Sequence, residues 1–315
     1  MSAKPTRRKK LLVTGASGLL GINLAFQVQA AGRYAMTGIT HSNALRGAPF
    51  EQVTADLGTP GSFERILEAT RPDFVIHTAA LANIDACEKN PAVSRRLNAE
   101  LPGEVALACA QHSVALVHIS TDAVFDGQRG GFAEDDAPNP QSVYATHKLA
   151  GELALTAANP AAAIARVNFY GWSLSGTRSL AEFFFNNLSA GQRINGFRDV
   201  LYCPLLANHL ADLLLELLEK GLHGAYHVLS REPLSKYEFG LRVARRFGLD
   251  ESLITPLSVA EGGLVAKRSP TLTLSVAKLE AALGHALPGQ AEGIEAFYQL
   301  FCAGYPQRVR QLAGA

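Results

Sequence analysis

Short apolar runs alternate with longer amphipathic stretches through the first half of the chain. The apolar runs predict strands over residues 10–14, 34–40, 74–78, 115–120 and 163–168. The stretches over residues 20–31, 62–69 and 92–111 have the length and periodicity of helices. Strands that alternate with helices form βαβ units, whose strands are parallel. We therefore expect an α/β fold with a doubly wound parallel sheet that binds ligands at the carboxyl ends of its strands.

A glycine-rich segment, Thr-Gly-Ala-Ser-Gly-Leu-Leu-Gly, follows the first predicted strand and begins the first predicted helix. Gly15 suits a tight turn, Gly18 lets backbone N–H groups approach a pyrophosphate, and Gly21 lets the helix pack closely on the strand. In this strand–loop–helix context the segment predicts a dinucleotide site. We expect these glycines and their neighbours Ser17, Leu19 and Leu20 to contact the cofactor.

The alternation of predicted strands and helices becomes irregular after residue 168 and then resumes. Residues 169–202 are rich in glycine, serine and aromatic side chains, a composition typical of loops that shape a substrate pocket. A helix is predicted over residues 208–220 and a strand over 225–229, and Ser235-x-x-Glu238 is a capping box. We therefore expect a Rossmann-like NAD(P)-binding domain formed by residues 1–168 and 207–228. A smaller, discontinuous substrate-binding domain would be formed by residues 169–206 and 229–315.

The segment after the second predicted strand indicates which nicotinamide cofactor is used. NAD-binding folds place an acidic residue there to bind the ribose 2′-hydroxyl, but residues 21–50 contain no Asp or Glu. His41, Ser42 and Arg46 stand there instead, and such groups bind a 2′-phosphate. The sequence therefore predicts a preference for NADP(H), with NAD(H) as the alternative. Asp56 and Leu57 are expected on the adenine side, where Asp56 is equally a candidate helix N-cap.

Four side chains at two places in the chain suggest carbonyl reduction. Tyr144 and Lys148 are four residues apart and share one face of a predicted helix, and Ser120 and Thr121 end a predicted strand. Reduction of a carbonyl needs a proton for the emerging alkoxide, and Tyr144 could supply it if Lys148 lowered the pKa of the phenol. Thr121, or Ser120 as its rival, would orient the carbonyl. The alternative is a core tyrosine, a solvated lysine and a threonine that caps a turn.

Composition narrows the classes of function. Hydrophobic residues make up 48% of the chain and charged residues 18%, a balance typical of a soluble globular enzyme. The net charge of +1 gives no reason to expect nucleic acid or an anionic membrane as a partner. The four cysteines lie far apart without a Cys-x-x-Cys, so we expect neither a disulfide framework nor a metal site, and a cytoplasmic location.

Longer segments carry a family resemblance. The glycine loop, the segments 77–85, 97–99 and 120–127, and the Tyr144–Lys148 pair resemble extended short-chain dehydrogenase/reductases, especially the dTDP-4-dehydrorhamnose reductase group. The resemblance is close over the first 170 residues and looser beyond. It implies a small-molecule carbonyl substrate, a 4-keto sugar nucleotide being one candidate, and a homodimer. It implies Tyr144 as the acid/base, Lys148 as its partner and Thr121 as the orienting hydroxyl. Further cofactor contacts are expected at Ala79, Ala80, Leu81, Asn98, Ser120, Tyr144 and Lys148. Substrate contacts are expected at Thr121 and Asp122, and at Asn168 and Tyr170, which lie in the stretch that shapes the pocket.

Ala123 limits what the resemblance implies. The reductases carry tyrosine at this position and the sugar-nucleotide dehydratases carry glutamate, so the chain lacks the acid needed for dehydration. Two alternatives stay open. One is a regulatory NAD(P)-binding subunit, because the methionine adenosyltransferase beta subunit resembles the chain in the same segments. The other is a sugar-nucleotide epimerase, which the missing carboxylate after the second strand disfavours.

Overall fold

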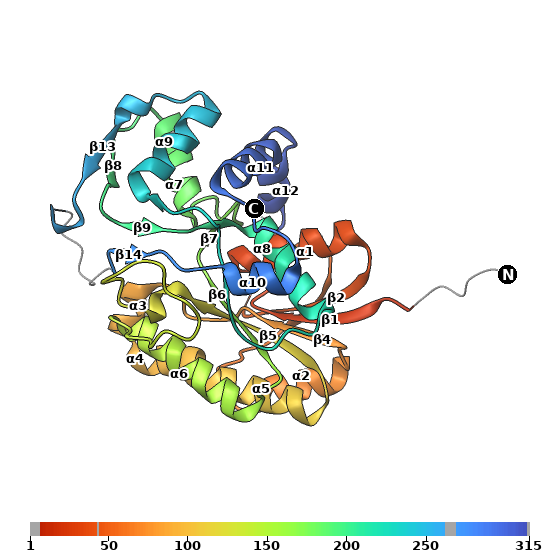
Figure 1. The fold of residues 1–315 in the computed structure, drawn as a ribbon. Coiled ribbons are helices and arrows are strands. Elements are labelled where there is room, and N and C mark those ends of the chain that lie inside the picture. Colours follow the sequence, from red (N-terminus) through yellow and green to blue (C-terminus); the bar gives the residue numbers. More distant parts are fainter. Residues whose placement is uncertain (1–6, 43, 262–268, 314–315) are drawn as a thin grey trace.

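A parallel sheet forms the centre of the computed structural model, which describes residues 7–42, 44–261 and 269–313 (Figure 1). In the described part the sheet has seven strands in the order β11-β6-β5-β4-β1-β2-β3, and every neighbouring pair is parallel. The strands are Lys9–Thr14 (β1), Tyr34–Thr40 (β2), Glu51–Thr54 (β3), Phe74–His77 (β4), Ala115–Thr121 (β5), Ala163–Val167 (β6) and Gly224–Val228 (β11). The predicted doubly wound α/β fold is confirmed.

The order of the strands determines which edge of the sheet can bind a ligand. The chain runs from β1 outward to β2 and β3, and then returns to form β4 on the other side of β1. The connections after β1 and β4 therefore leave in opposite directions, and a crevice opens at the carboxyl ends of these two strands. The edge strand β3 was not predicted, because its four residues are polar or only partly buried and carry little apolar signal.

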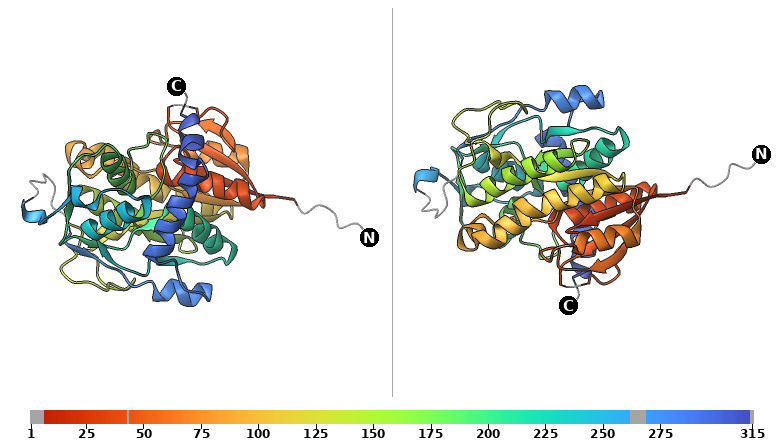
Figure 2. Two further views of the ribbon diagram at one scale, coloured as in Figure 1. Left: turned by 90° about the horizontal axis from the view of Figure 1, so that it is seen from above. Right: turned by 90° about the horizontal axis from the view of Figure 1, so that it is seen from below.

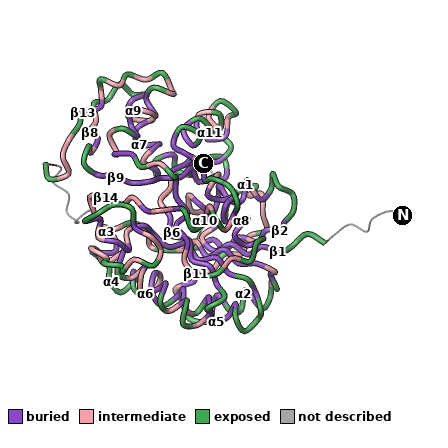
Figure 3. Tube along the Cα trace, in the orientation of Figure 1, coloured by how far each residue is buried: buried purple, intermediate pink, exposed green. Residues whose placement is uncertain are grey.

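Helices cover both faces of the sheet. One face carries Leu19–Ala31 (α1), Ala207–Glu219 (α8) and Ala277–Leu283 (α10), and the other carries Ser62–Thr70 (α2), Leu101–Gln111 (α5) and Val143–Ala158 (α6) (Figure 1). Seen from below, α5 and α6 lie side by side (Figure 2). The strands between these layers are the most deeply buried part of the chain (Figure 3). Two apolar cores result, one on each face.

The helix predicted over residues 92–111 is divided into three parts. Ile84–Lys89 (α3) precedes it, and the run consists of Pro91–Arg95 (α4), a π-helical turn over Arg96–Glu100 and then α5. Pro102 has no N–H to donate to the carbonyl of Asn98, so the regular helical bonding is lost at this point. Asn98 is fully buried within the wide turn.

A second lobe lies above the sheet in Figure 1. Its helices are Leu180–Ser189 (α7), Lys236–Phe247 (α9), Gln290–Cys302 (α11) and Tyr305–Gln311 (α12). Short strands pair between them: Phe169–Tyr170 (β7) with Leu205–Leu206 (β10), Ile194–Phe197 (β8) with Ile254–Leu257 (β13), and Leu201–Tyr202 (β9) with both Leu234–Ser235 (β12) and Thr271–Leu272 (β14). The predicted capping box at Ser235 and Glu238 begins α9.

The second lobe has its own aromatic core. Trp172 stacks on Phe297 with ring centroids 4.1 Å apart, and Tyr170 packs against Phe239 at 4.9 Å. Ile22 and Leu45 from the first part of the chain join this cluster, so the two lobes share apolar contacts. The division of the chain into two domains with the predicted boundaries stays a prediction.

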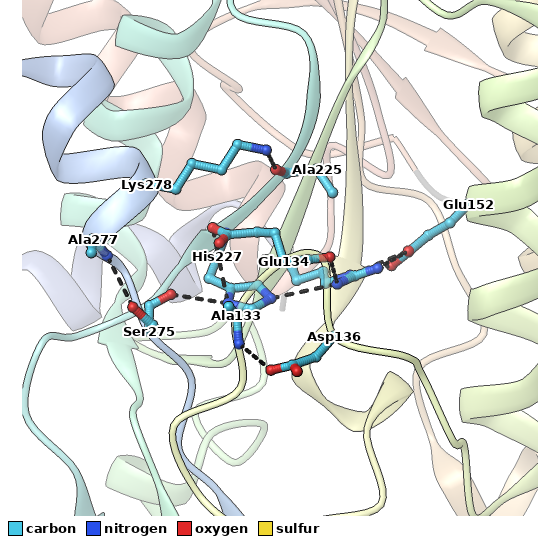
Figure 4. A network of polar contacts seen from close by, with 10 residues as sticks. Ala133, Glu134, Asp136, Glu152, Ala225, His227, Ser275, Ala277 and Lys278 are labelled. Carbon is cyan, nitrogen blue, oxygen red and sulfur yellow. Dashed lines mark hydrogen bonds and ion pairs between the residues drawn. The ribbon is translucent and has the colours of Figure 1, made fainter.

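A buried ion pair links the strands on one side of the sheet to α6 (Figure 4). Arg166 on β6 places Nη2 2.8 Å from Oε2 of Glu152 on α6, and both side chains are almost fully buried. The hydroxyl of Ser120 donates to the same carboxylate, and the guanidinium lies 3.5 Å from Nε2 of His227 on β11. The backbone N–H of His227 donates to Oε1 of Glu134, which fixes the connection between β5 and α6.

Replacement of Arg166 should destabilise the fold strongly. In Arg166→Met the carboxylate of Glu152 stays buried without its cation, and such a loss costs about 3–5 kcal/mol. We expect urea unfolding followed by circular dichroism to give this difference. The double variant E152M/R166M removes both charges and should lose clearly less stability than R166M. Equal losses for the two variants would show that the charge pairing is not the cause.

Candidate active site

The glycine loop sits directly against the loop that follows β4. Gly15 has a φ of 66°, and a Cβ at this position would lie 2.8 Å from Thr78 Oγ1 and 2.9 Å from the nitrogen of Ala79. The Thr78 hydroxyl donates to the carbonyl of Thr14 at 2.6 Å. The Thr14 hydroxyl in turn accepts from the backbone N–H groups of Thr78 and Ala79, both at 3.1 Å. The two loops are therefore fixed to each other, and only glycine fits at position 15.

The start of α1 faces a cavity of about 570 Å³. Gly18 is the N-cap residue and offers no side-chain cap, and the first turn contains no acidic residue. The first N–H groups of the helix and its positive dipole end thus favour an anion such as a pyrophosphate. The predicted cofactor residues that line the cavity are Gly15, Ser17, Gly18, Leu19, His41, Asp56, Leu57, Ala79 and Ala80.

Other predicted cofactor residues support the cavity without lining it. Leu20 is buried in the core, and Gly21 packs against the backbone of the glycine loop. Asn98 holds the loop after β4, because its amide accepts from the N–H of Leu81 and donates to its carbonyl, both at 3.0 Å. Ser42 and Arg46 are exposed and do not line the cavity, which His41 does. The N–H of Arg46 donates to the carbonyl of Leu312 at 2.9 Å, which ties this loop to the last helix.

A second cavity of about 450 Å³ contains the predicted catalytic hydroxyls. Thr121, Asp122, Tyr144 and Asn168 all line it. The Thr121 hydroxyl lies 3.1 Å from Asp122 Oδ1 and also hydrogen-bonds with Tyr144, and the amide of Asn168 donates to Asp122 Oδ2 at 2.8 Å. Tyr170, the fourth predicted substrate residue, is not brought to this cavity, because it lies in the aromatic core of the second lobe.

Two predicted residues lie just beneath the cavity walls. Ser120 points to α6 and donates to Glu152, so its hydroxyl is committed there and Thr121 is the strand-end hydroxyl that faces the cavity. Lys148 is 1% exposed. Its ammonium donates to the carbonyl of Ile119 at 2.6 Å and to Nε2 of His118 at 3.1 Å.

The local electrostatics suit a proton donor. Burial raises the pKa of Tyr144 above its ordinary value, and the hydrogen bond with Thr121 partly offsets this effect. Burial lowers the pKa of Lys148 to about 8, while the carboxylate of Glu152 opposes this shift. Burial raises the pKa of Asp122 to about 6. Near neutral pH, Tyr144 therefore carries its proton and Lys148 its charge.

Comparison with known proteins identifies the family. The sequence profile of the RmlD substrate binding domain family matches residues 9–302. The chain belongs to this family. It is 33% identical to a probable low-salt glycan biosynthesis reductase of Haloferax volcanii, over 92% of this chain and 97% of that protein. It is 34% identical to the dTDP-4-dehydrorhamnose reductase of Mycobacterium tuberculosis, over 85% of this chain and 86% of that protein.

A solved structure agrees with the family assignment. The crystal structure of a dTDP-4-dehydrorhamnose reductase from Clostridium acetobutylicum superposes with a TM-score of 0.80 and 26% identity, covering 93% of this chain and 99% of that one. The predicted resemblance to the dTDP-4-dehydrorhamnose reductase group is confirmed, and so is the prediction of an NAD(P)-dependent enzyme of the short-chain dehydrogenase/reductase type.

Sequence reasoning missed one wall of the first cavity. Ser173, Leu174, Ser175 and Arg178 line it from the segment between β7 and α7. Arg178 is exposed, and its guanidinium has no carboxylate partner among the residues that the structure describes. The Ser- and Gly-rich composition after Trp172 was the available signal, but it marks a loop without showing that the loop folds back over the start of α1. Lys236 of α9, at the second cavity, was missed for the same reason.

The described part of the chain has no helix that is both long and apolar enough to cross a bilayer. Nor does any group of three or more His, Cys, Asp or Glu side chains have an arrangement that could hold a metal ion. The four cysteines are free, and only Cys302 is exposed.

Gly15→Ala should abolish cofactor binding, because the new methyl group would push Thr78 and Ala79 away from the glycine loop. Gly32→Ala is a matched control: Gly32 has a φ of 67°, but a Cβ there would meet nothing within 4 Å. The control should lose only about 1–2 kcal/mol of stability, from the left-handed backbone, and should bind NADPH normally. Titration of NADPH fluorescence measures this, and equal affinities for the two variants would contradict the role of the close approach.

Proposed function

We propose that the chain reduces the carbonyl of a small or sugar-linked substrate with NADPH, with Tyr144 as the proton donor and a 4-keto sugar nucleotide as the leading substrate class. The observation that supports this most directly is the second cavity, which is lined by both Tyr144 and Thr121. The relatives named dTDP-4-dehydrorhamnose reductase support the substrate class. Ala123 lines the same cavity and brings only a methyl group, where the dTDP-4-dehydrorhamnose reductases carry tyrosine. The substrate class is therefore proposed from the relatives and not from this residue.

The first cavity fits a nicotinamide dinucleotide. Its glycine loop excludes side chains where a pyrophosphate would approach, and the uncapped N–H groups of α1 face the same space. Gly15, Ser17, Gly18 and Leu19 would hold the phosphates, and Asp56 and Leu57 would flank the adenine. When bound, the cofactor supplies the hydride. The protein's own residues orient the substrate and provide the proton.

The proton step follows from the hydrogen bonds of the site. The Thr121 hydroxyl donates to Asp122 Oδ1, and on substrate binding it would turn this proton to the substrate carbonyl and fix its position, since donors aimed at a developing oxyanion stabilise it. The phenol of Tyr144 would give its proton to the emerging alkoxide, and the resulting phenolate would be stabilised by the ammonium of Lys148 one helical turn away. Asn168 and Asp122 would complete the polar wall of the substrate site.

The preference for NADP(H) rests on charge. His41 and Arg178 line the cofactor cavity, and Ser42 and Arg46 are exposed in the segment that follows His41. The one nearby carboxylate, that of Asp56, lies 3.7 Å from Nε2 of His41 and is itself largely exposed. Four cationic or neutral donors against one paired carboxylate favour a 2′-phosphate over a free hydroxyl.

His41→Asp should reverse this preference. A second carboxylate beside Asp56 would repel the 2′-phosphate, and at an exposed site we expect a loss of about tenfold in NADPH affinity. The affinity for NADH should change little. His41→Asn places a side chain of the same shape as aspartate there but without the charge, and this variant should behave like the unchanged chain. Binding constants of both cofactors for the three proteins test this, and an equal loss for NADPH and NADH would contradict it.

Tyr144→Phe should remove turnover while NADPH still binds. A positioned acid contributes about 10²–10⁴-fold to such reactions, so the loss should fall in this range or above it. The assay is NADPH oxidation with dTDP-4-keto sugars beside simple ketones and aldehydes. Tyr170→Phe removes a phenol oxygen from the aromatic core and should retain activity. Undiminished turnover by Y144F would refute the role of Tyr144.

The same experiment separates the alternatives. A chain without NADPH consumption on any carbonyl, but with a co-purifying partner enzyme, would favour the regulatory subunit. A cofactor that stays bound through purification would favour the epimerase.

We also propose that residues 169–206 and 229–315 bind the substrate, a role that Tyr202 and Lys236 at the second cavity support. The homodimer and the cytoplasmic location stay predictions.

A further inference from the structure

A row of buried polar side chains crosses the sheet on the side of α6. Thr14, His77 and His118 are register partners on the adjacent strands β1, β4 and β5, and each is fully buried. The two imidazole rings stack with their centroids 5.1 Å apart. The ammonium of Lys148 lies at the end of the row, 3.1 Å from Nε2 of His118. The row therefore joins the glycine loop to the lysine of the proposed reaction.

The hydrogen bonds assign the proton of His77. Nδ1 of His77 lies 2.7 Å from the hydroxyl of Thr14, whose two lone pairs already accept from the N–H groups of Thr78 and Ala79. The hydroxyl must therefore donate its proton to Nδ1. His77 is left with its own proton on Nε2, where no partner stands among the described residues.

The same reasoning assigns His118. An ammonium group can only donate, so Nε2 of His118 accepts from Lys148 and the ring proton lies on Nδ1. This Nδ1 also has no partner in the described part of the chain. Burial and the neighbouring Lys148 hold the pKa of His118 well below its ordinary value, so the ring is neutral.

Stability alone does not explain these two rings. Each is fully buried and brings a donor that the surrounding protein does not match, whereas an apolar side chain of similar size would bring no such penalty. Since each buried ring costs stability in this way, its presence needs an explanation other than stability. Lys148 supplies one, because its ammonium is also buried and finds its acceptors only at Ile119 and His118 in the contacts described.

We propose that His118 is a positioning residue for Lys148, and that its Nε2 holds the buried ammonium charged and fixed against β5. This inference rests on the proposed function, in which Lys148 stabilises the phenolate of Tyr144, and on the predicted contact of Lys148 with the cofactor. His77 supports the ring of His118 from the other side and, through Thr14, links it to the cofactor loop. His118 itself touches neither cavity.

Several other groups influence the charge of Lys148. On its own helix Glu152 favours the charged form, but this carboxylate is shared with Arg166 of β6. The elements packed against this part of α6 carry further titratable groups, namely His118 on β5, Asp122 after β5, and Cys87 and Glu88 on α3. Tyr144 lies on α6 itself, and Asp122 and Cys87 act on its phenol. Among them, His118 is the titratable group whose side chain hydrogen-bonds the ammonium. Loss of this acceptor should therefore lower the pKa of Lys148, because a hydrogen bond to the charged form stabilises that form.

His118→Asn and His118→Gln form a matched pair for the test. Both are polar amides, but only the glutamine carbonyl reaches the position of Nε2. The readout is the affinity of the full chain for NADPH, followed by NADPH fluorescence from about pH 6 to about pH 10. In the unchanged protein the affinity should weaken as Lys148 loses its proton, near pH 8. In H118N the NADPH affinity should weaken at a pH about one unit lower. In H118Q the midpoint should return to that of the unchanged protein.

Lys148→Met provides the second control. It should bind NADPH with no midpoint in this range, and H118N/K148M should match it, because His118 then has nothing to hold. Circular dichroism checks that each variant is folded. An unchanged midpoint in H118N, a pH-independent affinity in the unchanged protein, or a further loss in H118N/K148M compared with K148M would each overturn the inference.

The outcomes also separate this inference from the proposed function. If no carbonyl is reduced but the midpoint moves as expected, then His118 still positions Lys148 and only the proposed reaction fails. If carbonyls are reduced with the same pH midpoint in H118N and in the unchanged protein, then the reaction stands and the role of His118 fails.

Discussion

Two loops that meet at the centre of the sheet determine the arrangement of this protein. The glycine loop after β1 and the loop after β4 approach so closely that a single methyl group on Gly15 would collide with Thr78 and Ala79. The contact exists because the strand order reverses between β1 and β4, which brings both strand ends to one crevice. The hydroxyl of Thr14 then fixes the second loop through two backbone N–H groups. The cofactor cavity, the buried row of side chains and the support of Lys148 all follow from this junction.

The sequence predicted the parts of the fold that depend on local pattern. Strands with continuous apolar runs, such as β4 and β5, bury nearly all their residues and gave a clear signal. The edge strand β3 did not, since three of its four residues are polar. The π-helical turn before α5 depends on Pro102 together with the close packing of α6 at Gly151. The hydrophobic periodicity of the sequence indicates neither of these, so a continuous helix was predicted.

The candidate site divides in the same way. The glycine loop, Thr121, Tyr144 and Asn168 were predicted because each stands at a strand end or helix start whose position follows from the pattern. Arg178 and Lys236 come from segments that return to the site from the second lobe, and no local rule places them there. Tyr170 was expected at the substrate because it follows β6, but the aromatic packing of the second lobe encloses it instead.

The hydrogen bond between Arg46 and Leu312 has a practical consequence for work with this protein. It places the last described helix beside the loop expected to recognise the adenosine phosphate, at the carboxyl edge of the sheet. The first strand begins at Lys9, at the opposite edge. An affinity tag or fluorescent fusion attached behind α12 would start next to the cofactor entrance and could disturb cofactor titrations. A tag attached before β1 would keep that entrance clear.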